Sequence, residues 1–292
     1  MREGFKNTPD DQTAAERLVS WLKKHGSAAL VAFAFKNRSK LRGVVDDVWK
    51  WETVDTFFAD FGIPRFQRFV DAATWPCVCG GQWREQAELA LTLNCIDKAD
   101  FCSFVMISLY EGRGEHVPVM VLMGSKGGEG KSFTLSPLRA LYGVENVQAT
   151  PQAKGNYPLL GLETKKACLL DDWTFGEKVL PLATQLLWYE GKPFPLPMPQ
   201  NSGAIGHVLY EGTAPVFVTT QEKSLGPLIQ KASIDWALGN PSEWTMLLRR
   251  LRVYRFWHPL PAHPSGAQKI KECPCCFSRM CLQHGRRPDA VA

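Results

Sequence analysis

The chain has 292 residues, of which 45% are hydrophobic and 22% are charged, so it is long and apolar enough to bury a sizeable core. Its formal net charge of +5 permits a nucleic-acid partner without arguing for one. No run of the sequence approaches the roughly 18 consecutive apolar residues of a membrane-spanning helix, so we expect no membrane partner.

The amino terminus and the cysteines indicate an intracellular protein. Residues 1–24 are polar and lack the apolar core of a signal peptide. The nine cysteines are an odd number and most are scattered, so we expect free thiols or metal ligands rather than disulfides, in a reducing compartment. The pattern fits the nucleus and the cytoplasm equally well.

Residues 1–96 have the pattern of an N-terminal helical region. Thr13–Glu16 can form a capping box, and residues 44–61 form an apolar-rich helical stretch with several aromatic side chains. Lysine and arginine alternate along residues 36–42. This alternation is typical of a solvated face, and contact with phosphates is the alternative.

An alternation of strands and helices begins near Asp97. Residues Phe101–Tyr110 have the pattern of an amphipathic helix, and short apolar runs then recur, as in the buried strands of a parallel sheet. These runs are Val117–Met123, Ala167–Leu170, Val216–Thr219 and Leu251–Phe256. The alternation predicts an α/β fold, with a parallel sheet between helices.

The first apolar run leads directly into a glycine-rich loop, Gly-Ser-Lys-Gly-Gly-Glu-Gly-Lys-Ser, at residues 124–132. A strand, such a loop and a following helix form the P-loop, which binds nucleoside triphosphates. Glycines let the loop wrap closely, so that its backbone N–H groups point at phosphate oxygens. The glycines that we expect to line bound ATP are Gly124, Gly127, Gly128 and Gly130.

Two side chains complete the predicted loop. We expect Lys131 to reach the β- and γ-phosphates of ATP and Ser132 to bind Mg²⁺. The loop has one more residue between Gly124 and Gly130 than the usual pattern. Pro137 lies inside the expected helix, where it removes a backbone hydrogen bond and should produce a kink.

Polar side chains flank the later strands. Asp171 and Asp172 follow one strand, so Asp171 can hold Mg²⁺ and Asp172 can orient or deprotonate the attacking water. Gln221 ends the next strand and can position that water. Several arginines, including Arg250, accompany the last strand and must find anions or water. Together these residues predict an enzyme that hydrolyses ATP.

In this order the motifs resemble those of the superfamily 3 helicases, the replication helicases of small DNA viruses, such as parvoviruses and papillomaviruses, and of related mobile elements. The matches are Walker A at residues 124–132, Walker B at 167–172, the B′ motif at 186–195, motif C at 215–221 and the arginine finger at Arg250. The resemblance covers residues 97–257, a little over half of the chain.

The resemblance implies an AAA+-like P-loop ATPase domain over residues 97–258 and a homo-hexameric ring around single-stranded nucleic acid, expected to be DNA. ATP would lie between subunits, with Lys131 on one subunit and Arg250 on its neighbour. The B′ motif implies a hairpin that touches DNA, although His207 is the one basic residue at its expected tip. Motif C normally ends in asparagine, where this chain has Gln221. The first hundred residues lack the nicking motif of many relatives, so we expect no nickase activity.

Two other functions remain open. The segment from Lys126 to Ser132 also fits the deviant Walker A loop of partition-type ATPases, in which Lys126 would reach across a dimer. The chain could also be a relic of a mobile element that binds nucleic acid without turnover. Gln221, Pro137 and the extra loop residue favour this last alternative.

Residues 259–292 read as a proline-rich linker and a basic tail with cysteine and histidine. Cysteine thiolates and imidazole suit tetrahedral zinc, and the predicted ligands of one Zn²⁺ are Cys273, Cys276, Cys281 and His284, with Cys275 as a substitute. The alternative is a disordered tail with free thiols. Cys77 and Cys79, in an earlier turn, are too closely spaced for a standard zinc site and have no obvious partners.

Overall fold

The structure is a computed structural model, and it describes residues 62–151, 157–199, 207–261 and 270–288. The chain divides into two compact units, Met1–Pro64 and Arg65–Ala292. The helical stretches and the basic segment expected before residue 62 lie outside the described residues. The second unit contains the glycine-rich loop at residues 124–132, the strand before it and the helix after it. It also contains helices on both sides of the domain boundaries that the sequence predicted near residues 97 and 259.

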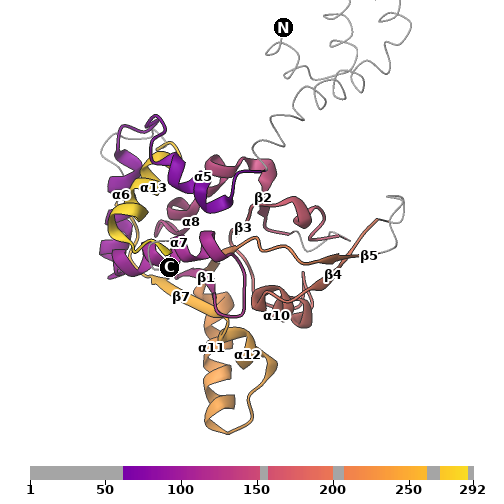
Figure 1. The fold of residues 1–292 in the computed structure, drawn as a ribbon. Helices are drawn as coiled ribbons and strands as arrows, with labels where there is room; N and C mark the ends of the chain where they lie inside the picture. The colour runs from indigo at the N-terminus through magenta and orange to yellow at the C-terminus, as the bar shows by residue number, and fades with distance from the viewer. Residues whose placement is uncertain (1–61, 152–156, 200–206, 262–269, 289–292) are drawn as a thin grey trace, which may run out of the picture. The chain divides into compact units, whose positions relative to one another are not determined.

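A five-stranded sheet in the order β2-β3-β6-β1-β7 forms the centre of the second unit, and all of its neighbouring strands run parallel (Figure 1). The strands are β1 Val119–Gly124, β2 Val147–Ala149, β3 Ala167–Leu170, β6 Val216–Gln221 and β7 Leu251–Phe256. The predicted α/β fold with a parallel sheet is therefore confirmed. The apolar runs marked four of these strands. The fifth, β2, has three residues of which one is buried, too little for a pattern to show.

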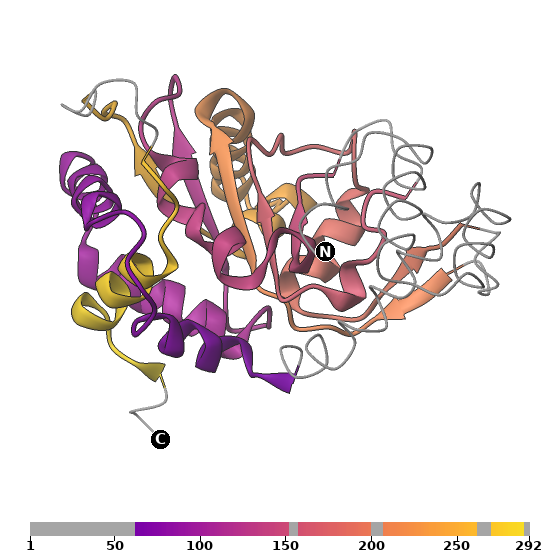
Figure 2. The same ribbon diagram turned by 90° about the horizontal axis from the view of Figure 1, so that it is seen from above.

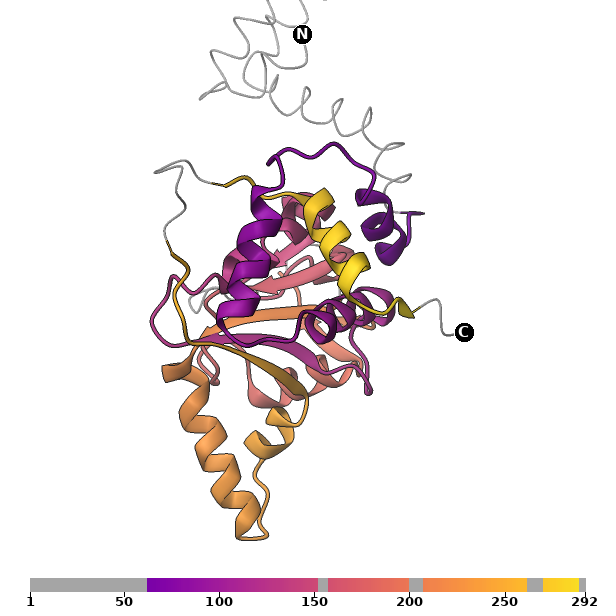
Figure 3. The same ribbon diagram turned by 90° about the vertical axis from the view of Figure 1, so that its left-hand side faces the viewer.

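One face of the sheet is covered by helices from the first half of the chain and by α13 near its end. These are α5 Arg65–Ala72, α6 Gln82–Leu93, α7 Lys98–Glu111, α8 Lys131–Leu135, α9 Pro137–Tyr142 and α13 Pro274–His284. Alternate strand residues, such as Met120 and Leu122, point into the same hydrophobic cluster as Trp83 and Phe277. Figures 1 and 3 show α13 lying beside α5 and α6 on this face.

The tail expected to lack a core is therefore part of the main core. Helix α13 buries Cys275, Phe277, Met280 and Cys281 against its neighbours. The alternative of an unstructured tail is wrong for residues 274–284, because this helix has an apolar face that the sheet domain covers.

The opposite face of the sheet packs on α10 Leu182–Glu190, α11 Glu222–Ala237 and α12 Glu243–Leu248. Here the other alternate residues, such as Val119 and Val121, meet Trp173 and Trp188. Helices α11 and α12 extend together away from the sheet (Figures 1 and 3). Short 3-10 turns occur at Val144–Asn146 and Leu162–Thr164.

An antiparallel hairpin follows α10, as the B′ resemblance implied. Its strands are β4 Phe194–Pro197 and β5 His207–Tyr210, and Gly191 ends α10 in the left-handed conformation. Figure 2 shows this hairpin and the yellow α13 on opposite sides of the sheet. Most of the hairpin's tip lies outside the described residues, and His207 at its edge is exposed.

Arg113 fixes the base of the hairpin. This buried side chain donates from Nε to the Gly212 carbonyl at 2.5 Å and from Nη1 to the carbonyls of Trp188 and Lys192 at 3.1 and 3.0 Å. Its guanidinium carbon also lies 4.6 Å from the centre of the Tyr210 ring. One cation therefore links the end of α10 to both sides of the hairpin.

The predicted kink at Pro137 is present as a break between two helices. Helix α8 ends at Leu135, and Pro137 takes the first position of α9, where a missing N–H costs no helical hydrogen bond. Among the described residues, no helix is both long and apolar enough to cross a lipid bilayer.

Candidate functional site

The glycine-rich loop lies between β1 and α8, at the carboxyl end of the central strand. Gly127, Gly128 and Gly130 have φ angles of 98°, 79° and 91°, which side chains with a Cβ rarely adopt. A Cβ on Gly124 would lie 2.3 Å from Lys131 Nζ, so a side chain there would displace the lysine ammonium group. The lysine side chain folds back over the end of β1.

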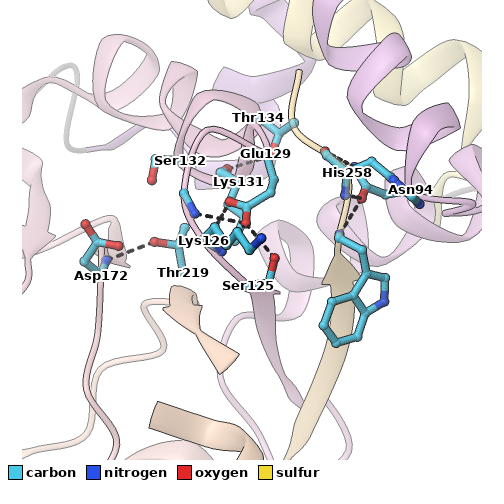
Figure 4. A network of polar contacts seen from close by, with 12 residues as sticks. Asn94, Ser125, Lys126, Glu129, Lys131, Ser132, Thr134, Asp172, Thr219 and His258 are labelled. Atoms are coloured by element: carbon cyan, nitrogen blue, oxygen red, sulfur yellow. Dashed lines mark hydrogen bonds and ion pairs between the residues drawn. The ribbon is translucent and has the colours of Figure 1, made fainter. Parts of the chain in front are cut away.

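The polar groups of the loop converge on one carboxylate, that of Glu129 (Figure 4). Lys131 Nζ lies 2.8 Å from Glu129 Oε2, and the backbone N–H groups of Lys126 and Gly127 donate to Oε1 at 2.6 and 3.0 Å. The side chains of Glu129 and Lys131 are 1% and 6% exposed, so solvent screens this pair little.

The protonation of Glu129 follows from these contacts. Burial by itself raises the pKa of the carboxyl group, but the hydrogen bonds from the Lys131 ammonium and from the loop backbone outweigh it and lower the pKa to about 2. Glu129 is therefore an anion at neutral pH, and the loop is arranged as a cradle for an anionic oxygen. The sequence predicted the anion-binding loop but not that Glu129 occupies it. The available signal was an acidic residue inside a loop whose backbone N–H groups are expected to point inward.

Oxygen ligands suitable for a divalent cation gather beside the loop. Ser132 Oγ donates to Asp171 Oδ1 at 2.5 Å, and Thr219 Oγ1 on β6 donates to the same atom at 2.6 Å. Hydroxyl and carboxylate oxygens are the ligands that Mg²⁺ prefers, so this donor set fits that ion. The structure thus brings together Ser132 and Asp171, as the sequence predicted, and adds Thr219.

The other two predicted groups lie at the same end of the sheet. Asp172 is exposed and has a φ of 50°, and its backbone N–H donates to Thr219 Oγ1 at 2.9 Å (Figure 4). Gln221 is aligned with Gly124 in the pairing of β6 with β1, so it ends its strand next to the start of the loop. In doubly wound sheets, ligands bind at the carboxyl ends of the strands, where these residues lie.

Arg250 lies at the other end of the sheet. It precedes Leu251, which pairs with Val119 at the start of β1, whereas the loop follows Gly124 at the strand's end. The six-residue strand separates the two by roughly 16–20 Å at about 3.3 Å per residue. Arg250 Nη2 forms an ion pair with Glu190 Oε2 at 3.0 Å. Within one chain it therefore does not reach Lys131.

The segment after β7 crosses the loop. The backbone N–H of Leu260 donates to the Gly128 carbonyl at 2.9 Å. Asn94 Oδ1 accepts hydrogen bonds from the backbone N–H groups of Trp257 and His258 at 2.6 and 2.8 Å, which anchors the segment to the end of α6 (Figure 4). The start of the predicted linker therefore supports the loop.

The cysteines form a cluster that differs from the predicted one. The Sγ atoms of Cys77, Cys79, Cys273 and Cys276 all lie within 4.8 Å of one another and could hold a metal ion. The expectation that Cys77 and Cys79 lack partners is therefore wrong. The turn that carries them packs against the start of α13, 196 residues later in the sequence, and spacing alone gives no sign of this.

The other two predicted zinc ligands point elsewhere. Cys281 is five residues beyond Cys276, about 140° around a helix, and lies buried beside Cys102 of α7. Burial and this neighbour raise the pKa of the Cys281 thiol. His284 Nε2 lies 3.2 Å from Glu88 Oε1. The predicted set of Cys273, Cys276, Cys281 and His284 is thus wrong for Cys281 and His284.

No protein-family model and no curated protein matches this chain. Solved structures that are similar to it include the A-form apo structure of the NrS-1 C-terminal region and the A-form apo structure of residues 305–718 of that region. Both are 12% identical and cover 68% of this chain, with TM-scores of 0.43 and 0.39. The chain spans less than half of each, 45% and 42%.

Proposed function

We propose that this chain is a Mg²⁺-dependent ATPase and the motor of a superfamily 3-type DNA helicase, with an AAA+-like fold. The observation that carries the proposal is the convergence of Lys131 and two loop N–H groups on one buried carboxylate. A site that holds the Glu129 anion so firmly has the donors that a phosphate group requires. The strand that precedes it and the acids beside it suit a nucleoside triphosphate.

The proposed roles follow from position. Phosphate oxygens take the place of the Glu129 carboxylate as the acceptors of Lys131 and the loop N–H groups. Ser132 and Asp171 hold Mg²⁺, which supplies positive charge to the phosphates when bound. Asp172, exposed beside this pair, accepts the proton of the attacking water, and Gln221 orients that water.

The ring and the nucleic acid are the second part of the proposal. Because Arg250 lies about a strand length from the loop of its own chain, it can act as an arginine finger only on the ATP of a neighbouring subunit. The exposed apolar side chains Ile234, Trp236 and Leu238 at the end of α11 offer a surface for subunit contact. The β4–β5 hairpin, held rigid at its base by Arg113, is the element that we assign to single-stranded DNA.

Phosphate release from ATP, with and without single-stranded DNA, tests the proposal. A helicase motor hydrolyses ATP in the presence of Mg²⁺ and is stimulated by single strands. ATP binding without turnover supports the relic instead. The exposure of Lys126 favours the partition-type alternative, in which this lysine reaches across a dimer. That alternative predicts a dimer, rather than a ring, in the presence of ATP.

A further inference from the structure

The cysteine cluster joins two segments that are distant in the sequence. Cys77 and Cys79 lie in the turn between α5 and α6, while Cys273 and Cys276 lie at the start of α13. Three of the four are buried and Cys77 is exposed, so the cluster has one side open to solvent. All four are free thiols rather than disulfide partners.

The separations of the sulfur atoms match a tetrahedral metal site. Four bonds of about 2.3 Å to zinc, directed at the corners of a tetrahedron, place the sulfurs about 3.8 Å apart. Cys77 Sγ lies 3.8, 3.9 and 3.5 Å from the Sγ atoms of Cys79, Cys273 and Cys276. Cys79 Sγ lies 3.5 Å from that of Cys276.

We propose that Cys77, Cys79, Cys273 and Cys276 bind one structural Zn²⁺. Soft sulfur ligands in a tetrahedron select zinc or iron, and four protein ligands leave no open position for a substrate, which is typical of structural rather than catalytic zinc. The ion closes a loop of 196 residues and holds the start of α13 against the start of α6.

The site supports the P-loop through Trp83. This residue lies in the first turn of α6, and its indole N–H donates to the Phe133 carbonyl in α8 at 3.2 Å. Its ring stacks on Phe133 and meets Phe277 of α13 edge-on, both with centroids 5.7 Å apart. Loss of the ion would loosen α6 and α13, and would therefore weaken the packing of Trp83 against Phe133 of α8. The metal thus stabilises the nucleotide site from outside, without touching the nucleotide.

Elemental analysis of the purified full chain tests this proposal. We expect one zinc per chain in the wild type and in Cys95→Ser, an exposed cysteine outside the cluster. We also expect it in Cys281→Ser, which removes a ligand of the spacing-based set. The double variant Cys77→Ser/Cys276→Ser should contain none. A wild-type chain without zinc, or with iron in its place, overturns the proposal, as does full zinc content in the double variant.

A second measurement does not depend on folding of the variants. Co²⁺ exchanged into the wild-type chain should give the intense visible absorption of tetrahedral thiolate coordination, and a chelator should lower its Tm while leaving that of metal-free samples unchanged. Weak absorption typical of octahedral Co²⁺, or no change in Tm with chelator, contradicts a structural site of four cysteines. Both readouts are independent of ATPase activity, so the zinc proposal can fail while the proposed function stands.

Discussion

Lys131 and Glu129 form a buried ion pair inside the loop, with Nζ and Oε2 2.8 Å apart. The carboxylate also accepts two backbone N–H groups, so it uses the same donors that a phosphate would. If the loop binds ATP, as proposed, the nucleotide must displace this carboxylate. Glu129 would then compete with the nucleotide for the phosphate site.

Glu129→Gln should tighten the binding of ATP by about tenfold or more. A hydrogen bond to a charged group contributes about 1.5–3 kcal/mol, and 1.4 kcal/mol is a factor of about ten in affinity. The amide keeps the size of the side chain but removes the competing charge. Titration with a fluorescent nucleotide measures the change, with Glu115→Gln as control, because Glu115 is an exposed acid before the start of β1, at the opposite end of that strand from the loop.

The pH dependence of binding gives an independent check on this competition. The pKa of Glu129 is lowered from 4.5 to about 2, so its contribution to stability is fully present above pH 4.5 and is lost progressively as the pH falls from there through about 2. Lowering the pH from 8 to 5 should therefore leave Glu129 charged and should not tighten the binding of ATP as Glu129→Gln does. An equal affinity of the variant and the wild type would mean that the carboxylate does not occupy the phosphate site.

Lys131→Ala should destabilise the free protein by about 3–5 kcal/mol, because it leaves the Glu129 carboxylate buried without its cation. The double variant Lys131→Ala/Glu129→Gln should recover most of this loss, since neither charge remains. Urea denaturation of the two variants measures both values. Equal stabilities of the single and double variants would show that the pair is not coupled.

Asp172→Asn should retain the binding of ATP and Mg²⁺ and lose turnover by about 10²–10⁴, the usual contribution of a general base. Asp171→Asn should weaken the binding of Mg²⁺ and raise the Mg²⁺ concentration needed for hydrolysis, because this carboxylate, which contacts Ser132 and Thr219, is the proposed ligand. Single-turnover rates and Mg²⁺ titrations separate the two effects. Undiminished turnover by Asp172→Asn would assign the base elsewhere.

Arg250→Ala should lower the rate of hydrolysis by about 10³–10⁵, as loss of an arginine finger does. Mixing these subunits with Lys131→Ala subunits should restore some activity, because some interfaces then contain both intact halves. Arg286→Ala is the control, because that exposed arginine follows α13 and bonds Ser103 Oγ through its backbone N–H, which the substitution retains. Full activity from a strictly monomeric protein would rule out a role in trans.

The sequence predicted those features that depend on neighbouring residues. Continuous apolar runs marked β1, β3, β6 and β7, and the pattern of glycines marked the turn between β1 and α8, because both signals are local. The short β2 has too few residues for any periodicity to show.

Contacts between distant segments could not be predicted in this way. Thr219 lies within an apolar strand, so the sequence gives no sign that its hydroxyl contacts Asp171. Cys77 contacts Cys273, 196 residues later, at the start of a helix that the sequence predicted to be part of a separate tail. Cys281 was wrongly included because spacing says nothing about which face of a helix a side chain occupies. The position of Glu129 depends on how the loop folds, and a glycine-rich sequence alone leaves that open.

Hydrolysis by two matched lysine variants tests the central claim most directly. Lys131 lies in the cradle and contacts its anion, whereas Lys126 is exposed in the same loop and contributes its backbone N–H. Phosphate release from ATP with Mg²⁺ should be abolished in Lys131→Ala/Glu129→Gln, in which neither buried charge remains, and should persist in Lys126→Ala. Wild-type rates from the first variant would contradict the assignment of the loop as the ATPase site.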